Sequence, residues 1–103
     1  MIIKPKRIYI AGQITGLIQE EFLENFSRAE VEIRVSGNIP INPSRLYVYG
    51  LSYEDYIKID RILLRSCDEI YMLSNWKDSP GARDELKWAQ NVGMKVWYER
   101  EGK

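Results

Sequence analysis

The chain has 103 residues, with 15 Lys and Arg, 15 Asp and Glu and no His, so its formal net charge at neutral pH is zero. This length predicts a single domain over residues 1–103. The charge balance argues against binding of DNA, RNA or an anionic membrane through a broad positively charged surface. One cysteine excludes a disulfide scaffold and a cysteine-based zinc site, and the lack of His removes the commonest metal ligand, so we expect neither a metal nor a cofactor.

Hydrophobic patterning and turn residues predict alternating strands and helices. In chain order we expect a strand at 7–11, a helix at 19–35, a short strand at 38–43, a helix at 53–66, a strand at 69–73, a helix at 80–92 and a strand at 94–98. This order favours an α/β fold, namely a small open doubly wound parallel sheet of about four strands flanked by helices, flavodoxin- or Rossmann-like. Ligands of such sheets bind beyond the carboxyl ends of the strands, which directs attention to the loops at 12–18, 42–52 and 74–81.

Two carboxylates lie on the apolar faces of predicted helices. At about 100° per residue, Glu85 falls between Ala89 and Val92 on the apolar arc of helix 80–92. The inner face of helix 53–66 is predicted to carry Tyr53, Tyr56, Ile59, Asp60, Leu63 and Cys67. Burying a carboxylate costs several kcal/mol unless it is hydrogen-bonded or protonated. One such residue is often structural, for example where it holds a Tyr hydroxyl, but two on consecutive helices favour the carboxylate pair of glycosyl-bond chemistry.

The loops contain further candidate groups. Ser79 before Pro80 predicts a helix N-terminus, whose N–H groups can bind an anion. Gly12 and Gly16 match neither a dinucleotide fingerprint nor a P-loop, and they indicate a tight turn that lets a ligand approach the backbone. The tyrosines between 47 and 56 form either a base-stacking wall or part of the core and an oligomer surface. The predicted substrate-binding residues are Gly12, Gln13, Asn42, Ser79, Gly81 and Ala82.

Four segments in order along the chain carry a family resemblance. They are 8–12 (IYIAG) with 15–16, then 41–43 (INP), then Asp60 with 67–72 (CDEIYM), and finally 76–85 (WKDSPGARDE). These segments resemble the nucleoside 2-deoxyribosyltransferase superfamily, and most closely its short bacterial and phage branch. The resemblance implies a doubly wound α/β fold and hydrolysis or transfer at the N-glycosidic bond of a (deoxy)nucleoside or nucleoside monophosphate. It also implies that Glu85 is the nucleophile, that Asp60 orients the sugar or handles the leaving base, and that Tyr9 lies close to Glu85.

One departure from the pattern bears on the substrate. Ser79 stands where the transferases carry an aspartate, and it is similar to the serine that helps to hold a 5′-phosphate in deoxynucleoside monophosphate N-glycosidases. This favours a nucleotide over a free nucleoside. We also expect burial to raise the pKa of Glu85, while the helix N-terminus and a hydrogen bond from Tyr9 offset that rise and leave the carboxyl ionised near neutral pH.

The expected partners are a small-molecule nucleoside or nucleotide and a second copy of the chain. The superfamily shares sites between subunits, and the loop tyrosines add to the expectation of a homo-oligomer. No apolar run approaches the length of a membrane span and the N-terminus lacks a signal-peptide pattern, which indicates a cytoplasmic protein. Two other classes of function stay open, a nucleotide-binding module without turnover and a structural interaction protein.

Overall fold

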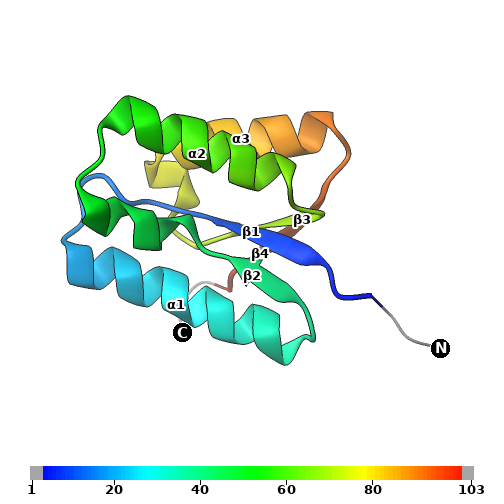
Figure 1. The fold of residues 1–103 in the computed structure, drawn as a ribbon. Coiled ribbons are helices and arrows are strands. Elements are labelled where there is room, and N and C mark those ends of the chain that lie inside the picture. The colour runs from blue at the N-terminus through cyan, green and yellow to red at the C-terminus, as the bar shows by residue number, and fades with distance from the viewer. Residues whose placement is uncertain (1–3, 101–103) are drawn as a thin grey trace.

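Four parallel strands form an open sheet at the centre of residues 4–100, the part of the chain that the computed structural model describes (Figure 1). The strands are β1 (Arg7–Ala11), β2 (Ile39–Ile41), β3 (Glu69–Met72) and β4 (Lys95–Tyr98), in the spatial order β2-β1-β3-β4. The chain moves from β1 to one side of the sheet and then returns to the other side, so the winding reverses between β1 and β3. This confirms the doubly wound, flavodoxin-like α/β fold and places its topological switch point between those strands.

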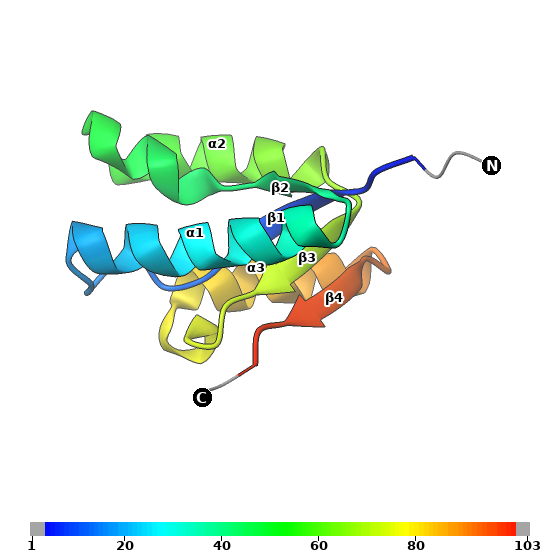
Figure 2. The same ribbon diagram turned by 90° about the horizontal axis from the view of Figure 1, so that it is seen from below.

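Helices cover both faces of the sheet. Helix α1 (Gln19–Val35) lies on one face, and α2 (Tyr53–Arg65) and α3 (Pro80–Asn91) lie on the other (Figures 1 and 2). Because successive strand side chains point to opposite faces, Tyr9 and Ala11 pack in the cluster with α2 and α3, whereas Ile8 and Ile10 pack in the cluster with α1. The alternation along β1 therefore decides that the Tyr9 ring faces the helices that carry Asp60 and Glu85.

The helix ends follow their sequence signals. The Ser52 Oγ accepts a hydrogen bond from the backbone N–H of Asp55 at 3.1 Å, and the Ser79 Oγ accepts one from the N–H of Ala82 at 3.1 Å. Beyond α3, Gly93 adopts a φ of 76°, which favours glycine and stops the helix. Within residues 4–100, every helix is too short or too polar to cross a membrane.

The second strand is shorter than predicted. We expected residues 38–43, but pairing stops at Ile41 because Asn42 turns the chain: its Oδ1 accepts the backbone N–H of Ser44 at 3.0 Å. Pro43 then opens a 3-10 helix, η1 (Pro43–Tyr49), in a segment predicted as loop. A second short 3-10 helix, η2 (Trp76–Asp78), forms in the loop after β3.

Two positions predicted on apolar helix faces are exposed. Tyr53 is 64% exposed, and it is the first residue of α2. Val92 is 56% exposed because it is the C-cap of α3 rather than part of its buried stripe. The angular pattern of a helix wheel predicts faces, but it does not say where along its axis a helix leaves the sheet.

Candidate active site

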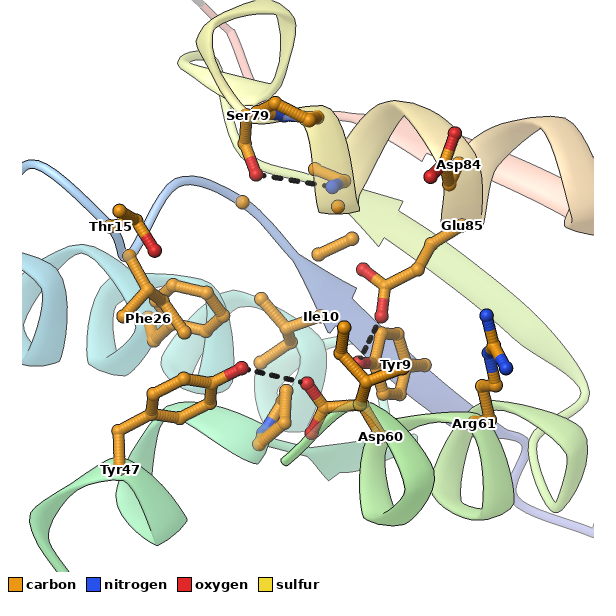
Figure 3. Close-up of a pocket in the computed structure, with 18 of the residues that line it drawn as sticks. Tyr9, Ile10, Thr15, Phe26, Tyr47, Asp60, Arg61, Ser79, Asp84 and Glu85 are labelled. Carbon is orange, nitrogen blue, oxygen red and sulfur yellow. Dashed lines mark hydrogen bonds between the residues drawn. The ribbon is translucent and has the colours of Figure 1, made fainter. Parts of the chain in front are cut away.

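A pocket of about 490 Å³ lies at the carboxyl end of β1, one of the two strands of the switch point (Figure 3). Residues from all three predicted loops line it, together with side chains from α2 and α3. The structure brings together the predicted site residues Tyr9, Gly12, Asp60, Ser79, Gly81, Ala82 and Glu85, and it leaves Gln13 and Asn42 outside the lining.

Tyr9 and Glu85 form the central contact of the pocket. The Tyr9 hydroxyl donates a hydrogen bond to Glu85 Oε2 at 2.6 Å, across 76 positions of sequence (Figure 3). Tyr9 is 1% exposed, so its ring is fixed by the core while its hydroxyl reaches the second turn of α3. Burial and the nearby Glu85 charge raise the pKa of Tyr9 well above its ordinary value, which keeps the hydroxyl protonated as a donor.

Asp60 lies opposite Glu85, on α2. The hydroxyl of Tyr47 donates to Asp60 Oδ2 at 3.0 Å (Figure 3). Asp60 Oδ1 is buried and has no hydrogen-bond partner among residues 4–100. Tyr47 is itself stacked on Tyr56, with ring centroids 4.0 Å apart and an interplanar angle of 11°. The structural interpretation raised from the sequence, in which Asp60 holds a Tyr hydroxyl, is confirmed with Tyr47 as the donor.

Burial dominates the electrostatics of the pair. Burial raises the pKa of Glu85 to about 8. The hydrogen bond from Tyr9 acts in the opposite direction and lowers this pKa, whereas the charge of Asp60 raises it further. Burial also raises the pKa of Asp60 to about 6, against the hydrogen bond from Tyr47. The expectation that the lowering effects leave Glu85 ionised near neutral pH is wrong: within residues 4–100, its hydrogen bond comes from one hydroxyl and from no backbone N–H. Burial therefore favours the protonated form of Glu85 more than the hydrogen bond from Tyr9 favours the ionised form.

The N-terminus of α3 forms one wall of the pocket. Ser79, Gly81 and Ala82 all line it, but the N–H of Ala82 is already capped by the Ser79 Oγ. A phosphate at this wall would meet the Ser79 hydroxyl and the N–H of Gly81. The predicted anion site therefore has fewer free hydrogen-bond donors than expected, because the Ala82 N–H is already bonded to the Ser79 hydroxyl that caps α3.

Gln13 and Asn42 support the loops instead of lining the pocket. The backbone N–H of Gln13 donates to Asn75 Oδ1 at 3.1 Å, which joins the loop after β1 to the loop after β3. The Nδ2 of Asn42 donates to Glu30 Oε2 at 2.9 Å, which joins η1 to α1. Asn75 thus holds the two loops at the switch point together, and no motif in the sequence singles it out.

Gly12 is explained by packing. A Cβ added to Gly12 would lie 2.4 Å from Cδ1 of Leu73, the residue that follows β3. Close approach of the two strand ends therefore requires glycine at this position.

Within the described residues, no group of three or more His, Cys, Asp or Glu side chains is placed to hold a metal ion.

Comparison with known proteins identifies a family. No curated protein and no solved structure matches the chain. A family model described as Domain of unknown function (DUF4406) matches residues 6–98, a range that includes β1 to β4 and every residue that lines the pocket. The chain therefore belongs to the DUF4406 family.

Proposed function

We propose that this protein is an enzyme that hydrolyses or transfers at the N-glycosidic bond of a (deoxy)nucleoside or nucleoside monophosphate, with Glu85 as the nucleophile. The observation that carries the proposal is the Tyr9–Glu85 hydrogen bond in a pocket that a second carboxylate, Asp60, also lines. Paired carboxylates in a partly dry cleft are typical of glycosyl chemistry. The resemblance of four segments to the nucleoside 2-deoxyribosyltransferase superfamily adds independent support.

In the proposed reaction the ionised Glu85 attacks the anomeric carbon, and the base leaves with the electrons of the C–N bond. Water or an acceptor base then attacks the glycosyl–enzyme ester from the opposite side, with overall retention. Tyr9 donates to the Glu85 carboxylate and favours its ionised form. Asp60 orients the sugar or passes a proton to the leaving base, for which its pKa of about 6 is suited.

The test is base release, measured by chromatography with a panel of nucleosides and nucleoside monophosphates. Glu85→Gln keeps the size of the side chain and removes the attacking charge, so we expect turnover to be lost while ligand affinity is largely kept. Glu24→Gln, an exposed residue of α1 outside the pocket, is the matched control and should behave as wild type. Full activity in Glu85→Gln would refute the mechanism.

The protonation of Glu85 favours a second candidate, a nucleotide-binding module without turnover. A protonated carboxyl does not attack an anomeric carbon, and burial raises the pKa of Glu85 to about 8, which favours the protonated form. A module of this kind should show a thermal shift with nucleotides and no base release at any pH. An enzyme in which Asp60 only orients the sugar should instead show kcat/KM rising with pH up to about 8, and one in which Asp60 donates a proton should show kcat/KM level between about 6 and 8.

A further inference from the structure

The charge of the pocket is unbalanced. Four carboxylate residues line it, namely Asp60, Asp78, Asp84 and Glu85, against the cation Arg61. Within residues 4–100, the salt bridges join Arg28 to Glu99 and Arg45 to Glu30, and neither involves the pocket. The hydrogen bonds to Asp60 and Glu85 come from neutral tyrosine hydroxyls. The carboxylate pair therefore lacks a counter-ion among the described residues.

The second observation is the unpartnered oxygen of Asp60. Asp60 is 9% exposed, and in Figure 3 its carboxyl points from α2 toward the Tyr47 hydroxyl, between the Tyr47 and Tyr9 side chains. Its Oδ1 is buried without a hydrogen-bond partner in residues 4–100. A buried carboxylate oxygen in this state is stabilised by a positive charge placed nearby.

The aromatic lining favours the same kind of ligand. Tyr47, Tyr53 and Phe26 line the pocket together with Tyr9, and Tyr53 is 64% exposed at its rim. Aromatic rings attract cations, and the attraction strengthens where water is excluded. Carboxylates without counter-ions and aromatic rings thus share one cavity, the combination that recognises an organic cation.

We propose that the substrate is an N-glycoside whose base carries a positive charge, of the pyridinium or N-alkylated purine class. This inference rests on the proposed function and narrows its substrate. The C1′–N bond breaks and its electron pair neutralises the base, while a Glu85 oxygen bonds to C1′. Water then replaces Glu85 at C1′, and one proton goes to solvent. A cationic base leaves as a neutral molecule, so the step needs no proton from Asp60.

The charge also accounts for how Glu85 becomes reactive. Burial raises the pKa of Glu85 to about 8. A cation beside a carboxyl favours its ionised form and lowers that pKa. Binding of a cationic substrate therefore prepares the nucleophile, whereas binding of a neutral nucleoside does not.

Binding is tested first, by isothermal titration at low salt. Carbocyclic nicotinamide riboside is cationic and cannot be cleaved, and its carbocyclic benzamide counterpart is neutral and of the same shape. We expect the cation to bind about tenfold more tightly or better. The ratio should fall toward one in Asp60→Asn and Glu85→Gln, rise in Arg61→Ala, and stay unchanged in Glu24→Gln. Equal affinities in wild type would overturn the inference.

Turnover separates the two proposals. We expect base release from nicotinamide riboside with a rate enhancement over the uncatalysed reaction that exceeds the enhancement for deoxyinosine. Cleavage of deoxyinosine with the larger enhancement would overturn the charge inference and leave the proposed function standing. Base release from members of the nucleoside and nucleotide panel without release from nicotinamide riboside would likewise overturn the charge inference alone. Release from no member of the panel and none from nicotinamide riboside would overturn both proposals.

Discussion

Glu85→Gln should remove a large part of the pH dependence of stability. The pKa of Glu85 is raised from 4.5 to about 8, because burial outweighs the hydrogen bond from Tyr9. The folded protein therefore holds this proton more tightly than the unfolded chain does. The contribution to stability is fully present below about pH 4.5 and is lost as the pH rises to about 8. Gln resembles the protonated acid and carries no such dependence.

The size of the effect follows from the width of this window. From 4.5 to about 8 the loss for wild type amounts to at most about 5 kcal/mol, at roughly 1.4 kcal/mol per pH unit. Asp60 contributes a second window between 3.8 and about 6, but this window is present in both proteins. The difference between wild type and Glu85→Gln therefore isolates Glu85.

The assay is urea unfolding followed by tryptophan fluorescence at about pH 5, 7 and 9. We expect the free energy of unfolding of Glu85→Gln to gain on wild type by several kcal/mol between the lowest and the highest pH. Glu24→Gln should follow wild type throughout. Parallel curves for wild type and Glu85→Gln would show that Glu85 titrates as an ordinary exposed glutamate, and the electrostatic description of the pocket would then be wrong.

Four other predictions follow from the same geometry. Tyr9→Phe removes the hydrogen bond that lowers the pKa of Glu85, so the loss of stability with rising pH should extend to higher pH in urea titrations. Gly12→Ala brings a Cβ to 2.4 Å from Leu73 Cδ1 and should cost about 1–3 kcal/mol of unfolding free energy. Ser79→Ala removes a helix cap at a cost of about 1 kcal/mol and should weaken calorimetric binding of nucleoside monophosphates but not of nucleosides, and equal losses would contradict a phosphate there. Sedimentation equilibrium at roughly tens of micromolar should show at least a dimer, and a pure monomer would contradict this.

The buried carboxylates show how far local patterning reaches. Helix periodicity places Asp60 and Glu85 on apolar faces, and the strand order predicts a parallel sheet with both helices beside it. Those two inferences are enough to expect both carboxylates on the inner faces of helices that flank one sheet, and the structure brings both into one pocket. Apolar and polar residues are clearly separated around these two helices, because one face packs on the sheet and the other faces solvent.

Contacts between loops lie beyond this kind of reasoning. The bond from Tyr47 to Asp60 depends on η1, which forms because Asn42 caps the turn at Ser44. The hydrogen bond from the Gln13 N–H to Asn75 depends on how the loop after β1 packs against the loop after β3. Neither leaves a periodic signal. The pKa of Glu85 was misjudged for the same reason, since it depends on the total depth of burial, which a helix wheel does not give.

The double role of Tyr9 limits how this family can diverge. Its ring belongs to the core cluster with Ile70 and Leu86, while its hydroxyl bonds Glu85 in the pocket. Under the proposed function, selection for folding and selection for chemistry therefore act on one side chain. Replacement by Phe keeps the ring and removes the hydroxyl, whereas smaller residues leave a cavity beneath the pocket. A lineage that loses the chemistry but keeps the fold should accordingly carry Phe at this position, so that the identity of one core residue separates active from inactive relatives.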